Sequence, residues 1–560
     1  MTALIECVPN FSEGRNPEVI RQITDRITAA GGVTLLHVDP GRDTNRTVVT
    51  FAGDPDSVVT AALEGIRAAA ALIDMRQHHG THPRMGATDV CPLVPIAGIT
   101  LEETARYARA LAERVGRELG IPVYLYEAAQ PNPARRNLAA IRAGEYEGLA
   151  DKMRRPEWRP DFGPTEFSPR HGATVIGARG FLVAYNVNLN TTSTRRANAV
   201  AFDVREVGRP LREGDPLTGK IVTDGQGQPV TQPGSLKAVK AIGWYIPQYG
   251  IAQVSMNLTD LAVTPLHVAF DEVCQKAESR GLRVTGSELV GLVPLQALVK
   301  AGRHFLRKQR RSAGVSEGEL VRIAVKSLGL DELAPFKPEE RIIEYRLRPP
   351  GEGALRALPL AAFADEVASE SAAPGGGSVA AAIGAFGAAL GTMVANLSAH
   401  KRGWDQRWEE FSRWAERGQA IKDHLLRLVD LDTEAFSRVM AALGLPKGTQ
   451  DEKAARNAAL AAANRGAIEV PLRVMRVAAE SFELLAAMAQ DGNPASVSDA
   501  GVGALAARAA VRGAWLNVRI NLAGLGDPRF AEQATTEGQQ LVQTAEAGEK
   551  RVLDIVEGKL

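Results

Sequence analysis

The chain has 560 residues, which is too long for a single hydrophobic core, so we expect two to four domains. Apolar residues make up 45% of the sequence and charged residues 23%, as in an ordinary soluble globular protein. The 66 basic residues balance the 65 acidic ones, which leaves no overall field for binding nucleic acid, and we expect no nucleic-acid partner.

The first 330 or so residues alternate short β-branched runs with amphipathic helical patterns. The second helical pattern begins with Thr100 and Glu103 in the spacing of a capping box. Alternating elements of this kind predict α/β layers. The strand-like runs are residues 33–38, 46–53, 91–98 and 123–128, and the helical patterns are residues 55–73 and 100–119.

A second α/β unit is predicted to begin near residues 173–190. Residues 46–70 and 252–277 both read as a strand, an Asp-containing turn and a helix, so the two units are expected to be related. Within the second unit, residues 205–235 are rich in Gly, Pro and charge, which predicts a long surface loop.

The composition changes after Pro349-Pro350-Gly351, beyond which Ala-rich, helix-period sequence continues with almost no strand pattern. The expected fold is multidomain: two related α/β sandwich subdomains followed by an all-α helical bundle domain. The expected ranges are 1–175, 176–335, a linker at 336–358, and 359–560.

Residues 379–397 carry no charge over a length that fits a membrane span. They are mostly Ala and Gly, include Thr392 and Asn396, and have no flanking basic cluster. We favour a buried helix whose small residues allow close packing, and expect no membrane span.

The cysteines and the N-terminal residues indicate in which cellular compartment the protein is expected. Cys7, Cys91 and Cys274 are far apart and odd in number, which favours a reducing compartment over a disulfide framework or a cysteine-rich zinc site. The first residues, MTALIECVPNF, lack the basic segment of a secretory signal. We therefore expect a cytoplasmic protein.

Three of the nine histidines, His78, His79 and His82, lie within five residues. This spacing differs from the H-E-x-x-H zinc pattern, and Gly80 and Pro83 make a helix improbable there. The remaining interpretations are a catalytic loop above a sheet and a solvated polar loop. No metal is expected.

Several motifs, taken together, resemble a known family. CVPNFSEGRN, VDPGRDTNRTVVTF, HHGTHPRMGATDVCPL, IRAGEYEGL, DFGPTEFSPRHGATVIGAR and QVSMNLTD resemble the formiminotransferase half of the formimidoyltransferase-cyclodeaminase family. In the helical half, SAAPGGGSVAA, LVDLDTEAF and GNPASVSDAGVGALAARAA resemble its cyclodeaminase half, which is cyclohydrolase-like.

The resemblance implies two reactions with tetrahydrofolate as co-substrate. A formimino group would move from N-formimino-glutamate to N5 of tetrahydrofolate, and closure onto N10 would then release ammonia and give 5,10-methenyltetrahydrofolate. It also implies that His82 is the catalytic base of transfer, that Asp432 is the acid of ring closure, and that the chain forms a homo-oligomer.

The chemistry of transfer favours His82 independently. An amine that attacks an amidinium carbon loses a proton, and the departing amine gains one; an imidazole titrates near neutrality and can do both. His78 falls on a family position. Arg84 and Arg46 are candidate carboxylate clamps, and Asp39 is a candidate for orienting a histidine or binding substrate. Ordinary surface ion pairs are the alternative for these charged residues.

Two segments are predicted to contact folate. The first matches the family's folate-binding loop, although His171 stands where an aromatic residue is expected. The second is a strand in which Asn186, Asn188 and Asn190 share one face and are expected either to read the pterin edge or to face solvent. The loop comprises Gly163, Pro164, Thr165, Glu166, Phe167, Ser168, Pro169, Arg170, His171 and Gly172.

In the helical half, periodicity places Asp432 on the apolar stripe of residues 421–439, whereas Asp423, Asp430 and Glu434 fall on a solvated stripe. A carboxylate on an apolar stripe requires partners or a function. Further candidates are an anion or carbonyl site at the start of a helix, and two amides four residues apart. These are Gly375, Gly376, Gly377 and Ser378, with Asn517 and Asn521.

Three functional hypotheses follow. The first is the bifunctional folate enzyme of histidine breakdown and one-carbon metabolism. The second keeps the fold but makes the helical half a methenyltetrahydrofolate cyclohydrolase, or gives the transferase a formyl donor. The third is a folate-binding scaffold with one inactive site.

Overall fold

The computed structural model describes residues 3–42, 44–80, 83–214, 219–347, 353–523 and 525–560. The chain forms two compact units. The first comprises Met1–Leu298 with Leu328–Arg348, and the second comprises Val299–Ser327 with Pro349–Leu560.

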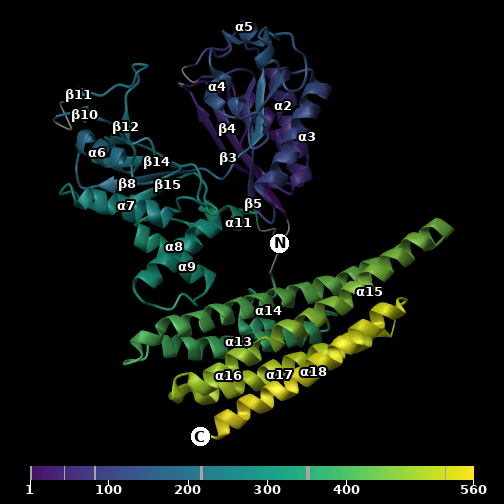
Figure 1. Ribbon diagram of the computed structural model, residues 1–560. Coiled ribbons are helices and arrows are strands. Elements are labelled where there is room, and N and C mark those ends of the chain that lie inside the picture. The colour runs from purple at the N-terminus through teal and green to yellow at the C-terminus, as the bar shows by residue number, and fades with distance from the viewer. Residues whose placement is uncertain (1–2, 43, 81–82, 215–218, 348–352, 524) are drawn as a thin grey trace. The chain divides into compact units, whose positions relative to one another are not determined.

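The first unit begins with a seven-stranded sheet in the order β1-β4-β2-β5-β7-β6, with β3 paired to β4 (Figure 1). Helices α1, α2 and α3 pack on it, and their apolar side chains form a core with Ile5, Cys7 and Phe11. The strands are β1 (Leu4–Cys7), β2 (Asn10–Phe11), β3 (Val33–Gly41), β4 (Arg46–Gly53), β5 (Thr88–Ala97), β6 (Val123–Glu127) and β7 (Thr174–Ala178). The helices are α1 (Pro17–Ala29), α2 (Pro55–Leu72) and α3 (Leu101–Leu119).

Most predicted elements of this layer are found. The four strand-like runs correspond to β3, β4, β5 and β6, and the helical patterns correspond to α2 and α3. The capping box of α3 is formed, since Thr100 accepts from the amide of Glu103 and Glu103 accepts from the amide of Thr100. β7 pairs in parallel with β5 and β6, so the first sheet extends slightly beyond the expected boundary at residue 175.

A second, antiparallel sheet has the order β13-β14-β8-β15. Alternation along β8 directs Tyr185, Val187 and Leu189 into the core, and α6 and α7 pack on this sheet. The strand-turn-helix echo between the halves is present as β4–α2 and β14–α7. The elements are β8 (Val183–Leu189), α6 (Thr194–Val204), β13 (Val239–Ile246), β14 (Ile251–Leu258), α7 (Leu266–Glu278) and β15 (Val284–Val290).

The predicted surface loop at 205–235 contains two short antiparallel ladders. They pair β10 (Arg212–Glu213) with β11 (Lys220–Ile221), and β9 (Arg209–Pro210) with β12 (Thr231–Gln232). Short helices complete the first unit: α4 (Leu138–Arg142), α5 (Leu149–Met153), α10 (Pro338–Arg341) and α11 (Ile343–Arg346). In the region that links the two sheets, Phe181 and Ile343 pack with Leu36 and Ala52.

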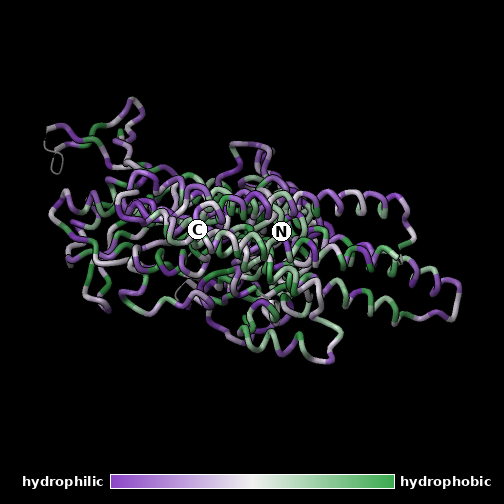
Figure 2. The backbone as a smooth tube through the Cα atoms, turned by 90° about the horizontal axis from the view of Figure 1, so that it is seen from below, coloured by the Kyte–Doolittle hydropathy of each residue, from purple (hydrophilic) through white to green (hydrophobic). Residues whose placement is uncertain are grey.

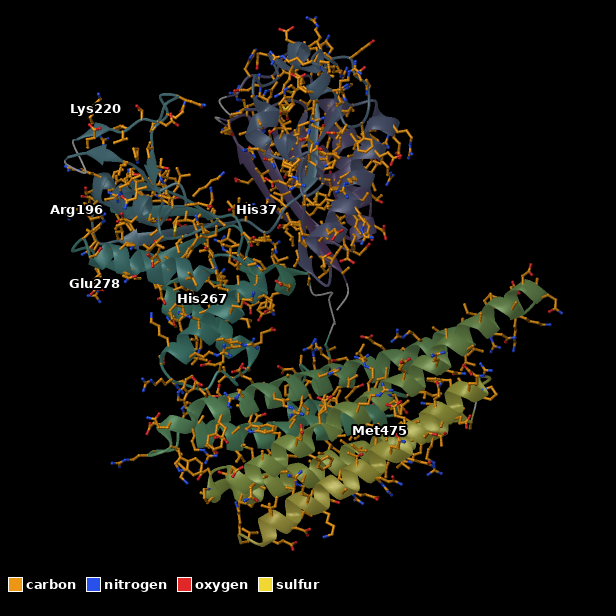
Figure 3. All side chains as sticks on the ribbon, in the orientation of Figure 1. His37, Arg196, Lys220, His267, Glu278 and Met475 are labelled. Carbon is orange, nitrogen blue, oxygen red and sulfur yellow. The ribbon has the colours of Figure 1, made fainter. Side chains whose placement is uncertain are left out.

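The second unit is the predicted helical bundle (Figure 1). Met475, labelled in Figure 3, is fully buried in its core. The helices are α12 (Leu360–Val367), α13 (Gly376–Ala399), α14 (Trp408–Leu443), α15 (Gln450–Ala479), α16 (Ser481–Asp491), α17 (Val497–Leu522) and α18 (Pro528–Glu557).

The bundle also includes residues 299–327, which contain most of α8 (Leu295–Lys308) and α9 (Glu317–Leu328). The amide of Ala313 donates to Ser412 Oγ at 3.1 Å, and Asn396 Nδ2 donates to the carbonyl of Gly314 at 2.9 Å. These compact units differ from the expected domain ranges, and the boundary at residue 335 stays a prediction. The segment belongs to the bundle through long-range contacts that its own helical pattern does not reveal.

The uncharged segment lies within α13, which packs against α14, α16 and α17. A side chain at Gly387 would press on α17, and one at Gly391 would press on Leu484 of α16, so small residues permit this packing. By length and composition, α13 is the one described helix that could cross a membrane. The helices that extend to the right in Figure 2 carry both hydrophilic and hydrophobic residues.

Two details of the stripes predicted on α14 differ from the structure. Asp430, expected on the solvated stripe, accepts from the amide of Leu355 at 3.1 Å and lies 3.7 Å from Arg356 Nε. Phe436, expected on the apolar stripe, is 38% exposed. Periodicity identifies faces of a helix but not which other segments cover them, and here the segment before α12 covers Asp430.

Glu6 on β1 makes the stability of the first unit depend on pH. Burial raises its pKa from 4.5 to about 7, with Arg179 opposing the shift and Glu344 reinforcing it. The pKa of Glu6 is higher in the folded protein than in the unfolded chain. The protonated carboxyl therefore contributes its full stabilisation of the first unit below about pH 4.5, and this contribution is lost as the pH rises through 7.

We expect Glu6→Gln to unfold at nearly the parent temperature at pH 5 and at a higher temperature at pH 8. The shift corresponds to a gain of about 3 kcal/mol at most. Scanning calorimetry at several pH values measures this. A difference between parent and variant that does not change with pH would contradict the assignment.

Candidate functional sites

In the first unit, the histidine loop and the predicted folate loop are joined by backbone pairing. Gly86 and Gly172 form an antiparallel bridge, in which the amide of Ala87 donates to the carbonyl of His171 at 2.9 Å and the amide of Ala173 donates to that of Met85 at 3.0 Å. A side chain on Gly86 would overlap the carbonyl of His171. The two motifs, far apart in sequence, are thus held at one place.

The predicted base, His82, lies outside the described residues, as does Thr81. The segments on both sides of them are described. Ser12 Oγ donates to the carbonyl of Gly86 at 2.8 Å, and the amide of Met85 donates to Asp89 Oδ1 at 3.0 Å. The C-terminal side of the histidine loop is therefore anchored to the first sheet.

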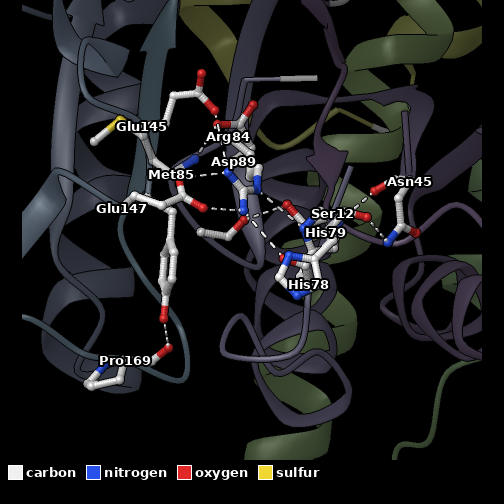
Figure 4. Close-up of polar contacts among 12 residues, drawn as sticks. Ser12, Asn45, His78, His79, Arg84, Met85, Asp89, Glu145, Glu147 and Pro169 are labelled. Atoms are coloured by element: carbon white, nitrogen blue, oxygen red, sulfur yellow. Dashed lines mark hydrogen bonds and ion pairs between the residues drawn. The ribbon is translucent and has the colours of Figure 1, made fainter. Parts of the chain in front are cut away.

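His78 is buried and both its ring nitrogens are used within the protein (Figure 4). Nε2 lies 2.8 Å from the carbonyl of Asn45, which can only accept, so Nε2 carries the proton. Nδ1 then accepts from Arg84 Nε at 3.3 Å. Burial lowers the pKa of His78. These contacts make His78 a neutral support for Arg84 and leave it no free nitrogen for a metal.

Arg84 is also buried, and its guanidinium forms a two-pronged pair with Glu147 at 2.7 and 2.9 Å (Figure 4). Glu145 approaches the same group at 3.4 Å. Hydrogen bonding to Glu147 raises the pKa of Arg84, and the same bonds lower the pKa of Glu147. The predicted carboxylate clamp therefore already holds a carboxylate of the protein.

Arg46 lies in a second charged cluster of the first unit. Burial lowers its pKa, while Asp89 and Asp39 oppose the shift and Arg142 reinforces it. Asp89 is buried and pairs with Arg142. Asp39 is exposed on β3. The cluster joins two predicted site residues, Arg46 and Asp39, to Asp89, which also anchors Met85.

The 163–172 loop is mostly exposed between structured ends. Gly163 has a φ of 80°, and a side chain there would overlap the carbonyl of Ile121, so this glycine sets the start of the loop. At the other end, the ring of His171 lies 3.1 Å from Ser168 Oγ, and burial lowers its pKa. Pro164, Thr165, Glu166, Pro169 and Arg170 are exposed, and Phe167 is half-buried.

Asn186 and Asn188 lie on the face of β8 opposite the core, as alternation predicts, but both are buried. Asn188 donates to Glu332 at 2.6 Å and accepts from Gln253 at 2.8 Å. Asn186 donates to Glu288 at 3.4 Å. These amides thus hydrogen-bond to neighbouring side chains, and a contact with the pterin remains a prediction for them.

Two neighbouring cavities adjoin the histidine loop and share Gly144 and Glu145. The first, of about 450 Å³, is lined by His79, Gly80, Arg84, Gly144, Glu145 and Glu147. The second, of about 940 Å³, extends from Pro83 and Arg142 to Lys240, Thr259 and Asp260, which belong to the part of the unit built around the second sheet. The larger cavity is therefore bounded by both sheet-containing parts of this unit.

Sequence reasoning missed Glu147 and Asn45 as members of this site. The motif IRAGEYEGL contributes Glu145 and Glu147, and a pair of acids within a recognised motif was a usable signal. Asn45 has a φ of 47°, a conformation that Asn tolerates better than most residues, and its carbonyl holds His78.

In the second unit, Asp432 meets the N-terminus of α13. Ser378 Oγ donates to Asp432 Oδ2 at 3.0 Å and lies 3.2 Å from Thr433 Oγ1. A side chain on Gly377 would overlap the Asp432 carboxylate, so the absence of a Cβ lets the carboxylate reach this helix end. Burial raises the pKa of Asp432, although hydrogen bonds from Ser378 oppose the shift.

The two predicted amides of α17 differ in their surroundings. The amide of Asn517 lies next to Gly376 and donates to the carbonyl of Gly513 at 3.0 Å. Asn521 instead donates to the carbonyl of Ala467 on α15 at 2.9 Å. One group of predicted residues therefore gathers at one place, with Gly375 as the N-cap of α13: Gly376, Gly377, Ser378, Asp432 and Asn517. Asn521 instead ties α17 to α15.

Comparison with known families covers almost the whole chain. The formiminotransferase domain, N-terminal subdomain, matches residues 4–179, and the formiminotransferase domain matches residues 184–348. The formiminotransferase-cyclodeaminase model matches residues 359–540. These ranges contain, respectively, the histidine and folate loops, the second sheet, and the Asp432 site.

Individual relatives agree with this division. Glutamate formimidoyltransferase of Streptococcus pyogenes serotype M1 is 39% identical over 55% of this chain and 94% of its own length. Methenyltetrahydrofolate cyclohydrolase of Methylorubrum extorquens is 40% identical over 35% of this chain and 95% of its own length. Formimidoyltransferase-cyclodeaminase of Sus scrofa is 46% identical over 560 residues, which span 100% of both chains. This full-length identity, together with the three matching models, shows that the chain belongs to the formimidoyltransferase-cyclodeaminase family.

Proposed function

We propose that this chain transfers the formimino group of N-formimino-L-glutamate to N5 of tetrahydrofolate in its first unit and closes the ring in its second. Tetrahydrofolate is the co-substrate, and the products are glutamate, ammonia and 5,10-methenyltetrahydrofolate. The observation that supports transfer most directly is the pairing of the histidine loop with the 163–172 loop. It would bring a general base and a folate-binding segment together.

In transfer, N5 attacks the amidinium carbon of the donor and loses a proton, and the glutamate nitrogen departs after gaining one. His82 is the proposed group for both proton movements. In ring closure, N10 attacks the formimino carbon and loses a proton, and the departing nitrogen is protonated and leaves as ammonia. Asp432 is suited to this exchange because burial raises the proton affinity of its carboxylate.

Incubating the pure protein with tetrahydrofolate and N-formimino-glutamate tests both reactions together. Methenyl absorbance with equimolar ammonia supports the bifunctional enzyme. The cyclohydrolase-like match of the helical half makes hydrolysis of supplied methenyltetrahydrofolate the second activity to measure. N-formyl-glutamate tests a formyl donor, and folate binding without turnover at either site would indicate a scaffold.

We also propose that the chain self-associates in a cytoplasmic setting, where the two reactions would link histidine degradation with one-carbon metabolism. Support for self-association comes from α17, on which Val502, Leu505, Leu516 and Ile520 are exposed at helical spacing, with Ile520 at 73%. Exposed apolar stripes of this kind are typical of interaction surfaces.

His82→Ala is expected to lose formimino transfer by a factor of about a hundred or more, the usual contribution of a general base. Ring closure of supplied 5-formimino-tetrahydrofolate should be retained, because Asp432 and its neighbours lie in the other unit. Separate assays of each half-reaction measure this. Loss of both activities in a folded variant would contradict two independent sites.

Asp432→Asn preserves volume and much of the hydrogen bonding with Ser378 but cannot exchange a proton. We expect a folded protein that transfers the formimino group and accumulates 5-formimino-tetrahydrofolate, with closure slowed by about a hundredfold or more. Product analysis by chromatography measures the intermediate. Closure within a few-fold of the parent rate would make Asp432 structural.

Gly377→Ala places a methyl group where the Asp432 carboxylate lies. We expect closure to fall at least about tenfold, because a displacement on the ångström scale disrupts catalytic geometry, while transfer stays unchanged. Gly466→Ala is the matched control, since it adds the same methyl to a helix of the same bundle in open space. Equal closure rates in the two variants would show that Gly377 does not shape the site.

A further inference from the structure

The Arg84–Glu147 pair is asymmetric. The side chain of Arg84 is 8% exposed, whereas that of Glu147 is 64% exposed. Removing the Glu147 carboxylate would leave the buried charge of Arg84 with the more distant Glu145, at 3.4 Å, as its ionic partner, which is costly. Moving Glu147 into water costs little once another carboxylate takes its place, because its side chain is already largely solvated.

Arg84 is held from behind by groups that do not depend on Glu147. Its Nε donates to His78 Nδ1 and its Nη2 donates to the His78 carbonyl, both at 3.3 Å. The His78 ring is in turn held by the carbonyl of Asn45. The guanidinium can therefore keep its orientation while its carboxylate partner changes.

The space for such an exchange is present. The cavity of about 450 Å³ is lined by Arg84 together with Glu145 and Glu147. A guanidinium fork matches any planar carboxylate, so it does not distinguish the Glu147 side chain from a carboxylate of a glutamate derivative.

Tyr146, which lies between Glu145 and Glu147 in the sequence, links this pair to the folate loop. Its hydroxyl donates to the carbonyl of Pro169, and its ring centroid lies 5.5 Å from that of Phe167. The guanidinium carbon of Arg84 lies 5.9 Å from the centre of the Tyr146 ring. Tyr146, the sequence neighbour of Glu147, therefore connects Arg84 with the 163–172 loop.

We propose that Glu147 is a built-in occupant of the substrate-carboxylate site and that a carboxylate of N-formimino-glutamate displaces it from Arg84. This rests on the proposed transferase function. The exchange keeps the charge of Arg84 neutralised throughout. It also makes Glu147 a specificity-determining competitor, because a ligand binds well only if it supplies a carboxylate of its own.

Glu147→Gln tests the proposal because two roles predict opposite signs. A displaceable occupant predicts a KM for N-formimino-glutamate lowered about three- to tenfold, as expected when a partly exposed competing ion pair is removed. A residue that only orients Arg84 predicts a higher KM. A raised KM would overturn the proposal, and so would a KM that stays unchanged both in this variant and in the double variant described next.

Two further variants complete the comparison. Glu18→Gln is the matched control, because Glu18 forms the same two-pronged pair with Arg21 on the exposed face of α1; its kinetics should equal those of the parent. The double variant Glu145→Gln/Glu147→Gln addresses Glu145 moving into the vacated position. If Glu145 substitutes for Glu147, only the double variant shows the lowered KM; if neither variant does, the proposal fails.

Calorimetric titration with L-glutamate separates this proposal from the proposed function. We expect Glu147→Gln to bind L-glutamate about three- to tenfold more tightly than the parent, whether or not transfer is assayed. If the parent shows no transfer but the variant binds L-glutamate more tightly, only the transferase function is refuted. Normal transfer in the parent with equal or weaker glutamate binding in both the single and the double variant would refute only the displacement.

Discussion

Close approach of backbone without an intervening side chain is the constraint on which both sites depend. In the first unit, Gly86 lies against the carbonyl of His171, and this contact aligns the histidine loop with the 163–172 loop. In the second unit, Gly377 leaves room for the Asp432 carboxylate at the start of α13. A single added methyl group would separate the partners in either place, since interiors are too closely packed to absorb it.

The predictable part of the fold was the part governed by local pattern. Strand β4 and helix α3 match their expected ranges because alternation, helical period and the Thr100–Glu103 capping box are properties of adjacent residues. The assignment of residues 299–327 to the bundle depends instead on contacts such as that between Ala313 and Ser412. Nothing in either segment alone indicates its partner.

The same distinction applies to the candidate sites. Motif resemblance and residue chemistry identified Arg84, His78 and Asp432, and Asp432 was recognisable because a carboxylate interrupted an apolar stripe. The partners of these residues were not predictable. Glu147 is 63 residues from Arg84 in sequence, and no periodicity relates them. His78, which falls on a family position, has its two ring nitrogens engaged by Asn45 and Arg84, and a contact with substrate stays a prediction for it.

The two sites compensate buried charge in opposite ways, and the difference suits their chemistry. Arg84 is paired with the largely exposed carboxylate of Glu147, which our proposal makes exchangeable for the carboxylate of an anionic substrate. Asp432 is compensated by the hydroxyl and amide of Ser378, which are neutral donors. Neutral donors stabilise the carboxylate too weakly to cancel the cost of burial, so its pKa rises. An arginine beside Asp432 would stabilise the charged carboxylate and lower its pKa, whereas the neutral donors leave the pKa raised, as the proposed proton exchange requires.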